Sequence, residues 1–215
     1  MTPELVRDPT RAGGPGVLVW RFPAPRRALS SAPLGGGIGL ARWAINAQVP
    51  ADYARRDPGA HLAELAASFG LTGQGVGMMT AVDVRNWRSA DEDGVVVAAT
   101  VGVTVPTWAA APDDGSDHHG AVAAVPGTIN IVATVPAALD DGALVNAATT
   151  VAEAKAQALW DRGVPATGTA SDALCVACPV EGPAVAFGGP RSYWGSRLAR
   201  AVHRAVLAGL AVAPA

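Results

Sequence analysis

The chain has 215 residues, of which 50% are apolar and 16% charged, and its formal net charge is −2. This composition predicts one sizeable domain with a core of small side chains, and the balanced charge excludes a basic surface for nucleic acid. No apolar run reaches the roughly 18 residues of a transmembrane helix, and the first residues lack the apolar stretch of a signal peptide, so we expect no membrane span and a cytoplasmic location.

The N-terminal half contains more predicted strands than helices. Residues 1–16 are rich in Pro, Gly and Arg, which predicts a loose arm, and residues 17–215 are predicted to form a single domain. The prolines of 21–27 predict a break between a first strand and the residues that follow. Strands are predicted over 17–20, 43–49, 75–84, 94–105 and 126–135.

Helices are predicted mainly in the C-terminal half, after one short helix over 58–69. Asp140 or Asp141 is predicted to cap a long helix that runs to about Arg162, where Gly163 ends it. A short buried strand over 173–178 and a final helix over 192–210 follow. This order predicts an α/β fold in the broad sense, an α+β sandwich in which a mixed sheet is covered by two or three helices.

Two glycine-rich runs and a pair of cysteines share spacings with cofactor and metal motifs, but their contexts differ. The run 35–39 has no glycine three residues after its last one, so it fails the dinucleotide fingerprint, and the run 73–77 precedes a strand instead of a helix. Cys175 and Cys178 have C-x-x-C spacing without a second ligand pair for zinc. We therefore predict tight turns and buried thiols, no cofactor and no dedicated metal, including in the His- and Asp-rich loop 113–119.

A lysine interrupts the apolar stripe of the long helix. At about 100° per residue, Lys155 falls within the stripe and Glu153 falls on the opposite side. The stripe comprises Leu144, Ala148, Val151, Ala152 and Leu159. A lysine in such a position must extend to solvent, pair with a carboxylate or serve a site, and the first two outcomes are the more common.

The turn after this helix, ATGTASDALCVAC, concentrates hydroxyl and carboxyl side chains in front of a buried strand. Amide hydrolysis needs an activated nucleophile, an oxyanion stabiliser and an acid for the leaving amine. Thr169 or Ser171 can supply the nucleophile, and Asp172 can act as a base or an orienting group. Lys155 can act as the electrophile, and the short helix-to-strand connection predicts that it lies near Asp172. The alternative is a structural turn in which the aspartate accepts hydrogen bonds from backbone amides.

Two asparagines lie inside predicted apolar strands, Asn46 in WAINAQV and Asn130 in GTINIVA. A buried amide needs hydrogen-bond partners. Together with Thr80 in MMTAVDV, these residues predict a polar pocket lined from the sheet, with strand-end bulges or turns as the alternative.

In their order and spacing, these segments resemble the adenosylcobinamide amidohydrolase family, the CbiZ type. The resemblance covers most of the chain and leaves out the arm before Ala28. Two departures are visible: Pro106 and Thr107 stand where the family commonly has Asn-Ala, and Ser171 stands where it usually has threonine. The matching pieces are GVGMMTAVDV, PGTINIVATVP, TTVAEAKAQAL, ATGTASDALCVAC and FGGPRSYWGSRLARAVHRAVLAG.

The resemblance implies hydrolysis of the aminopropanol amide of adenosylcobinamide, or of its phosphate, to give adenosylcobyric acid in corrinoid salvage. The corrinoid is then the substrate, with no separate cofactor, no nucleic-acid partner and no membrane partner, and a homo-oligomer is left open. A non-catalytic corrinoid-binding module and another small-amide hydrolase are the alternatives, and a cofactor-binding oxidoreductase is the weakest. The predicted catalytic residues are Asp172, Lys155, Thr169 and Ser171. The predicted substrate-binding residues are Asn46, Thr80, Asn130 and Glu153.

Overall fold

The computed structural model describes residues 1–7, 16–112 and 127–211. Its eight strands form one mixed sheet in the order β4-β3-β2-β8-β7-β6-β5, with β1 paired to β2 beside this path. The strands are β1 (Glu4–Arg7), β2 (Gly16–Ser30), β3 (Gly37–Gln48), β4 (Gly75–Thr80), β5 (Arg88–Glu92), β6 (Val95–Val101), β7 (Ile129–Thr134) and β8 (Ala173–Pro179). The helices are α1 (Pro58–Ser68), α2 (Asp141–Asp161) and α3 (Tyr193–Leu210). The predicted α/β fold is confirmed.

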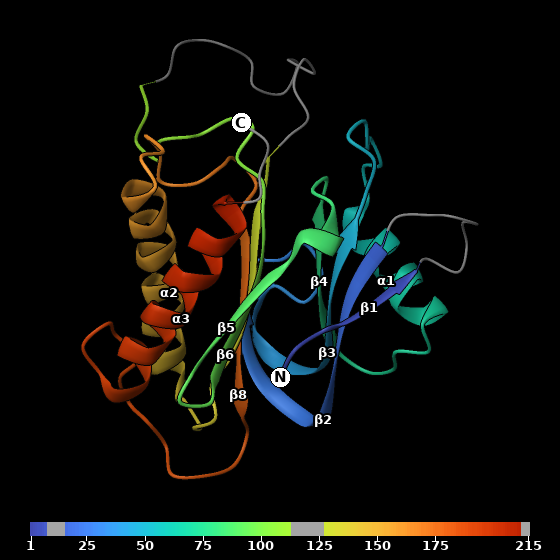
Figure 1. Cartoon of the computed structure of the whole chain (residues 1–215). Helices are drawn as coiled ribbons and strands as arrows, with labels where there is room; N and C mark the ends of the chain where they lie inside the picture. Colours follow the sequence, from blue (N-terminus) through green and yellow to red (C-terminus); the bar gives the residue numbers. More distant parts are fainter. Residues whose placement is uncertain (8–15, 113–126, 212–215) are drawn as a thin grey trace.

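The long strand β2 bends and belongs to both halves of the sheet. Its first half pairs with β1 and β3, and its second half pairs with β3 and β8. The register with β3 shifts between Arg21 and Arg26. The predicted break at 21–27 is therefore wrong: Pro23 and Pro25 lie at a bulge, where a strand tolerates residues without an N–H donor. The sheet turns a corner there, so that its two halves face one another (Figure 1).

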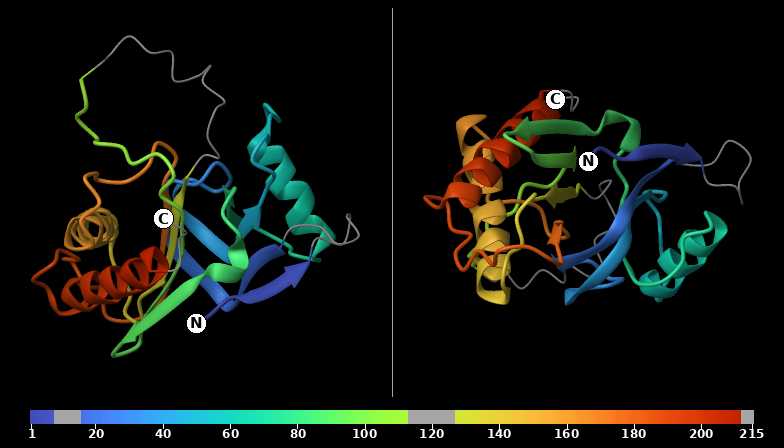
Figure 2. Two further views of the ribbon diagram at one scale, coloured as in Figure 1. Left: turned by 45° about the horizontal axis from the view of Figure 1, so that its top comes forward. Right: turned by 90° about the horizontal axis from the view of Figure 1, so that it is seen from below.

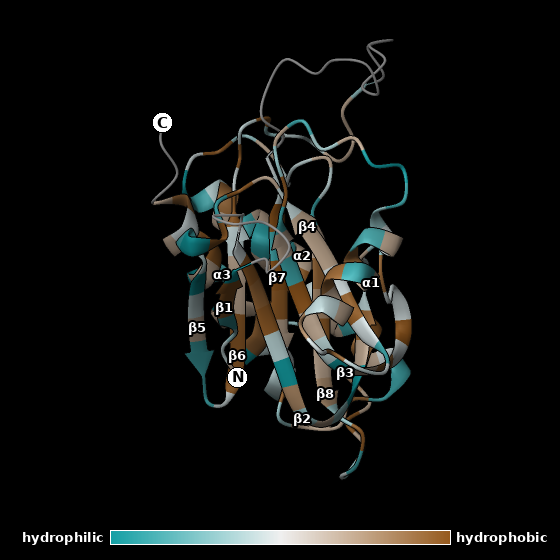
Figure 3. Cartoon of the chain, turned by 90° about the vertical axis from the view of Figure 1, so that its right-hand side faces the viewer, coloured by the Kyte–Doolittle hydropathy of each residue, from teal (hydrophilic) through white to brown (hydrophobic). Residues whose placement is uncertain are grey.

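The molecule has four layers, with helices outside the two facing halves of the sheet. Figure 2 shows α2 and α3 on one side and α1 on the other, and Figure 3 shows α1 in front of β3 and β4. Odd-numbered residues of β6 and β7 pack under α2 and α3, whereas even-numbered ones face the other half of the sheet. The core between the halves includes Leu18, Trp20, Ala44, Met78, Ala98, Val132 and Cys175.

The predicted ends of the two long helices are confirmed. The Asp140 side chain accepts a hydrogen bond from the backbone N–H of Ala143 and caps α2, and Gly163 follows its last turn with a φ of 75°. The stripe predicted along α2 is partly wrong, because Ala152 is exposed and Thr150 is buried. Thr150 tolerates burial because its hydroxyl donates to the carbonyl of Gly188 at 3.1 Å.

Several strand boundaries differ from the predictions. The strands predicted over 75–84 and 94–105 end at Thr80 and Val101. Strand β5 was missed because RSADE is polar, as is common for a strand at the edge of a sheet. Residues 4–7 form β1 instead of belonging to a loose arm. No helix in the described ranges is long and apolar enough to cross a membrane.

The two cysteines are buried and unpaired, as predicted. Cys175 faces the core between the two halves of the sheet, and Cys178 faces the core under the helices. Burial raises the pKa of the Cys175 thiol to about 12. This thiol is therefore neutral in the folded protein well above the pH at which it ionises in the unfolded chain.

We predict that Cys175 makes the folded protein lose stability in alkali. Because its pKa is raised on folding, its contribution is fully present below the unfolded pKa of 9.0 and is lost as the pH rises to about 12. The free energy of unfolding should fall by up to about 1.4 kcal/mol per pH unit more in the wild type than in Cys175→Ala. Urea unfolding of both proteins between pH 7 and 11 measures this difference, and parallel losses above pH 9 would contradict it.

Candidate active site

Asp172 is the centre of a polar cluster where β7 and β8 begin. Its Oδ2 accepts hydrogen bonds from Lys155 Nζ at 2.5 Å and from the Thr169 backbone N–H at 3.1 Å. Its Oδ1 accepts from the Thr169 hydroxyl at 2.5 Å and from the Ile129 backbone N–H at 2.8 Å. The predicted proximity of Lys155 and Asp172 is confirmed, and the backbone bonds expected of a structural turn are also present. Both readings of the sequence therefore describe part of this cluster.

The cluster is largely withdrawn from solvent but not sealed. The side chains of Lys155 and Asp172 are 15% and 13% exposed. Lys155 borders the buried face of α2, where Ala154 and Ala158 pack into the core. Its aliphatic stem can follow that face while the ammonium reaches the carboxylate. The ion pair is therefore better shielded from water than the exposed Arg27–Asp141 pair, whose side chains are 38% and 62% exposed.

Because Gly168 has no side chain, the ion pair can lie directly against its backbone. A Cβ at this position would collide with Asp172 Oδ2 and Lys155 Nζ. Its backbone is held by Thr107, whose N–H donates to the Gly168 carbonyl at 2.9 Å. Pro106 and Thr107 together form one of the two departures from the family pattern, and the hydrogen bond between Thr107 and Gly168 uses backbone atoms. A change of side chain there is therefore compatible with the same hydrogen bond.

Ser171 points to a second hydroxyl instead of to the carboxylate. Its Oγ lies 2.6 Å from Thr128 Oγ1 and donates to the Gly127 carbonyl at 3.5 Å. Ser171 is exposed, and Thr128 is buried at the start of β7. Thr128 is not among the residues predicted from the sequence, although the motif PGTIN places it two residues before Asn130 and hence on the same face of the chain.

The two predicted asparagines meet between the facing halves of the sheet. Asn130 Nδ2 donates to Asn46 Oδ1 at 2.9 Å and to the Met79 carbonyl at 2.8 Å, and Asn46 Nδ2 donates to Thr100 Oγ1 at 2.9 Å. Both asparagines are 2% exposed, and Asn130 Oδ1 has no hydrogen-bond partner among the described residues. This network joins β3 to β6 and β7, although neither of these strands pairs with β3 in the sheet. It holds the two halves together, and contact of these asparagines with substrate stays a prediction.

Thr80 and Glu153 do not join these groups through side-chain hydrogen bonds within the described residues. The Thr80 hydroxyl is buried and accepts from the Val82 N–H in the turn after β4. Glu153 is exposed, and two helical steps place it about 160° around α2 from Lys155. Within the described ranges, no three His, Cys, Asp or Glu side chains are placed to hold a metal ion. The loop 113–119 lies outside those ranges.

The chain matches the family model described as adenosylcobinamide amidohydrolase (CbiZ) over residues 5–214. It is 34% identical over 195 residues to an adenosylcobinamide amidohydrolase of Halobacterium salinarum, which covers 89% of this chain and 84% of the relative. It is 29% identical over 189 residues to one of Methanosarcina mazei, with coverages of 84% and 88%. A crystal structure of the PH0078 protein of Pyrococcus horikoshii superposes with a TM-score of 0.49 at 12% identity, covering 99% of this chain and 84% of that one.

The chain therefore belongs to the adenosylcobinamide amidohydrolase family. The match begins at residue 5, so the prediction that residues before Ala28 fall outside the resemblance is wrong. Of those residues, 4–7 form β1 and 16–27 form most of β2, and both strands belong to the sheet that contains β7 and β8.

We predict an asymmetry between the two partners of the ion pair. Asp172→Asn leaves the shielded Lys155 ammonium without its carboxylate and should lower the free energy of unfolding by about 2–3 kcal/mol. Lys155→Met leaves Asp172 its three other donors and should cost only about 1 kcal/mol. Urea unfolding measures both, with Asp141→Asn in the exposed pair as a control that should change stability by less than about 0.5 kcal/mol. Equal losses in the two site variants would contradict this assignment.

Proposed function

We propose that this chain hydrolyses the aminopropanol amide of adenosylcobinamide, or of its phosphate, and releases adenosylcobyric acid in corrinoid salvage. Membership of the family supports the reaction class, and two relatives bear the name of this activity. The observation that carries the assignment of the site is the contact between a hydroxyl, a carboxylate and an ammonium at Thr169, Asp172 and Lys155.

Thr169 is the proposed nucleophile. Its hydroxyl already donates to Asp172 Oδ1 at 2.5 Å, which is the geometry of a nucleophile and its base. Attack on the amide carbon forms an ester to Thr169 after the C–N bond breaks, and the hydroxyl proton passes through Asp172 to the leaving amine. Water then cleaves the ester, with Asp172 accepting a proton from the water and returning it to Thr169.

Lys155 is the proposed source of positive charge. The carbonyl oxygen gains negative charge when the amide carbon is attacked, and a shielded ammonium stabilises this charge more than it would in bulk water. Lys155 is already oriented by Asp172, so little reorganisation is needed when substrate binds. The Ile129 and Thr169 backbone amides hold the carboxylate while its other partners react.

Ser171 is the alternative nucleophile. It is more exposed than Thr169, but its partners are the hydroxyl of Thr128 and the carbonyl of Gly127, and neither is a base that can accept its proton. The contact with Asp172 therefore favours Thr169. We propose that Ser171 and Thr128 bind an amide arm of the substrate at the mouth of the site.

We further propose that the reaction needs no cofactor besides the corrinoid substrate and no metal ion. The support is that Asp172 has its acceptor positions filled by donors of the chain itself. A cytoplasmic location stays a prediction, and the oligomeric state stays open.

Incubation with adenosylcobinamide should give adenosylcobyric acid and aminopropanol, detected by mass spectrometry. The same protein should keep most of its activity in EDTA, because the proposed reaction uses only side chains of the chain. A spectral shift without product would favour a corrinoid-binding module, and no response at all would favour another small-amide hydrolase. Loss of activity in EDTA that one divalent ion restores would overturn the metal-free mechanism.

Thr169→Ala should lower kcat by about 100-fold or more, because a missing nucleophile or acid–base partner typically costs a factor of about 10²–10⁴. Thr169→Ser should keep turnover within about 10-fold, since it retains the hydroxyl. Thr167→Ala is the matched control in the same loop, because its hydroxyl contacts the backbone of Thr107 and Ala109 and not the carboxylate. Near-normal turnover by Thr169→Ala would remove Thr169 from the mechanism and direct the search to Ser171.

A further inference from the structure

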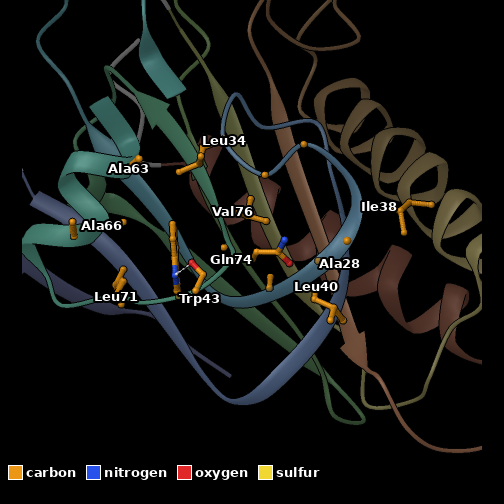
Figure 4. A pocket seen from close by; sticks show the side chains of 17 residues that line it. Ala28, Leu34, Ile38, Leu40, Trp43, Ala63, Ala66, Leu71, Gln74 and Val76 are labelled. Atoms are coloured by element: carbon orange, nitrogen blue, oxygen red, sulfur yellow. Dashed lines mark hydrogen bonds between the residues drawn. The ribbon is translucent and has the colours of Figure 1, made fainter. Parts of the chain in front are cut away.

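A hollow of about 460 Å³ lies between α1, the start of β4 and the bent ribbon of β2 and β3. Both glycine-rich runs of the sequence meet there, since its lining includes residues 35, 36, 39, 73 and 75. Figure 4 shows Ala63 and Ala66 of α1 on one side and Ala28 on the other. Its volume is in the range of small-molecule sites, roughly 300–1,000 Å³.

Gly39 forms part of the floor of this hollow and has no evident structural reason to be glycine. It lies within β3 opposite Ala28, and a Cβ added to it would meet no atom within 4 Å. Its φ is outside the left-handed range. Glycine weakens a strand, and in a strand it often marks close approach by a ligand or another chain. Gly39 and Ala28, which face each other across the β2–β3 pairing, both line the hollow.

Gln74 is the polar side chain of the lining, which contains no charged side chain among the described residues. Its backbone carbonyl accepts from the Arg42 N–H at 2.7 Å, so the residue is anchored. Its side-chain amide is exposed, and it projects across the hollow toward Ala28 (Figure 4). A primary amide has a donor and an acceptor side by side, which match the N6 and N7 edge of adenine.

The hollow and the Asp172 cluster are joined by the loop between β2 and β3. Ser31, in that loop, donates its N–H to the Leu174 carbonyl at 3.1 Å, and its Oγ accepts from the Leu174 N–H at 3.1 Å. Gly39, in the lining of the hollow, lies two strands from Ala177, which lies five residues after Asp172. Strand spacings put the Cα atoms of Gly39 and Asp172 roughly 20 Å apart. A corrinoid bound across both places would hold its adenosyl group at one end and an amide arm at the other.

We propose that this hollow binds the adenosyl group of the substrate, with the purine over Ala28 and Gly39 and its polar edge on the Gln74 amide. The proposal rests on the proposed function, because it takes adenosylcobinamide as the ligand. A nucleoside fits a neutral hollow of this size, whereas a corrin ring with its arms does not. Specificity for the adenosyl form is then separate from the chemistry at Asp172.

The test compares adenosylcobinamide with cyanocobinamide, which has the same corrin and amide arm but lacks the nucleoside. Dissociation constants come from spectral titration of the full chain, with every protein carrying Thr169→Ala so that adenosylcobinamide is not consumed during the titration. Gln74→Leu should weaken binding of adenosylcobinamide about 10-fold or more, and Gly39→Val should do the same by filling the hollow. Both variants should bind cyanocobinamide within about 3-fold of the wild type, and Gln157→Leu, at an exposed position of α2, should bind both like the wild type.

Equal losses for the two cobinamides, or no loss for either, would overturn the adenosyl site. So would equal affinity of the wild type for both compounds, or no binding of either. Selective, Gln74-dependent binding without any hydrolysis would support the site while the proposed function fails. Urea unfolding of Gly39→Val checks that this variant folds. Gln74→Leu changes an exposed side chain, so it tests the site even if Gly39→Val is unstable.

Discussion

The four hydrogen bonds accepted by Asp172 are the constraint on which the arrangement of the site depends. They tie together the C-terminal part of α2 through Lys155, the following loop through Thr169, and the start of β7 through Ile129. A carboxylate satisfies this many donors only if all of them converge, so the positions of helix, loop and strand are coupled. The same group that is proposed to move protons therefore also sets the geometry in which they move.

A second polar network continues from this one into the core. Asn130 follows Ile129 directly, and its side chain points to the opposite face of β7, where it meets Asn46 and the Met79 carbonyl. The two networks therefore meet β7 at successive residues, one at the backbone N–H of Ile129 and the other at the side chain of Asn130. Buried amides in a core of small apolar residues are costly unless paired, so they select one alignment of the two halves.

The sequence predicts local features well and misses those that depend on distant partners. Asp140, Gly163 and Ser192 mark the helix ends because capping is decided within a few residues. The contact of Lys155 with Asp172 is predictable because the connection between them is short. The path of β2 through Pro23 and Pro25 is not, because it depends on pairing with β8 far along the chain. Thr100 and the hollow beside Gly39 could not be predicted for the same reason. The partner of Thr100 is Asn46, and the hollow is lined by segments that are distant in the sequence.

Because β2 belongs to both halves of the sheet, it also affects how the chain folds during its synthesis. The first half of β2 can pair with β3 soon after both leave the ribosome, but its second half faces β8, which is synthesised more than a hundred residues later. Until then, one edge of β2 has unpaired backbone groups, and such edges invite pairing with other chains. Contacts between distant segments also slow folding. Yield in a fast-translating host should thus depend on protecting this unpaired edge of β2 until β8 has been synthesised.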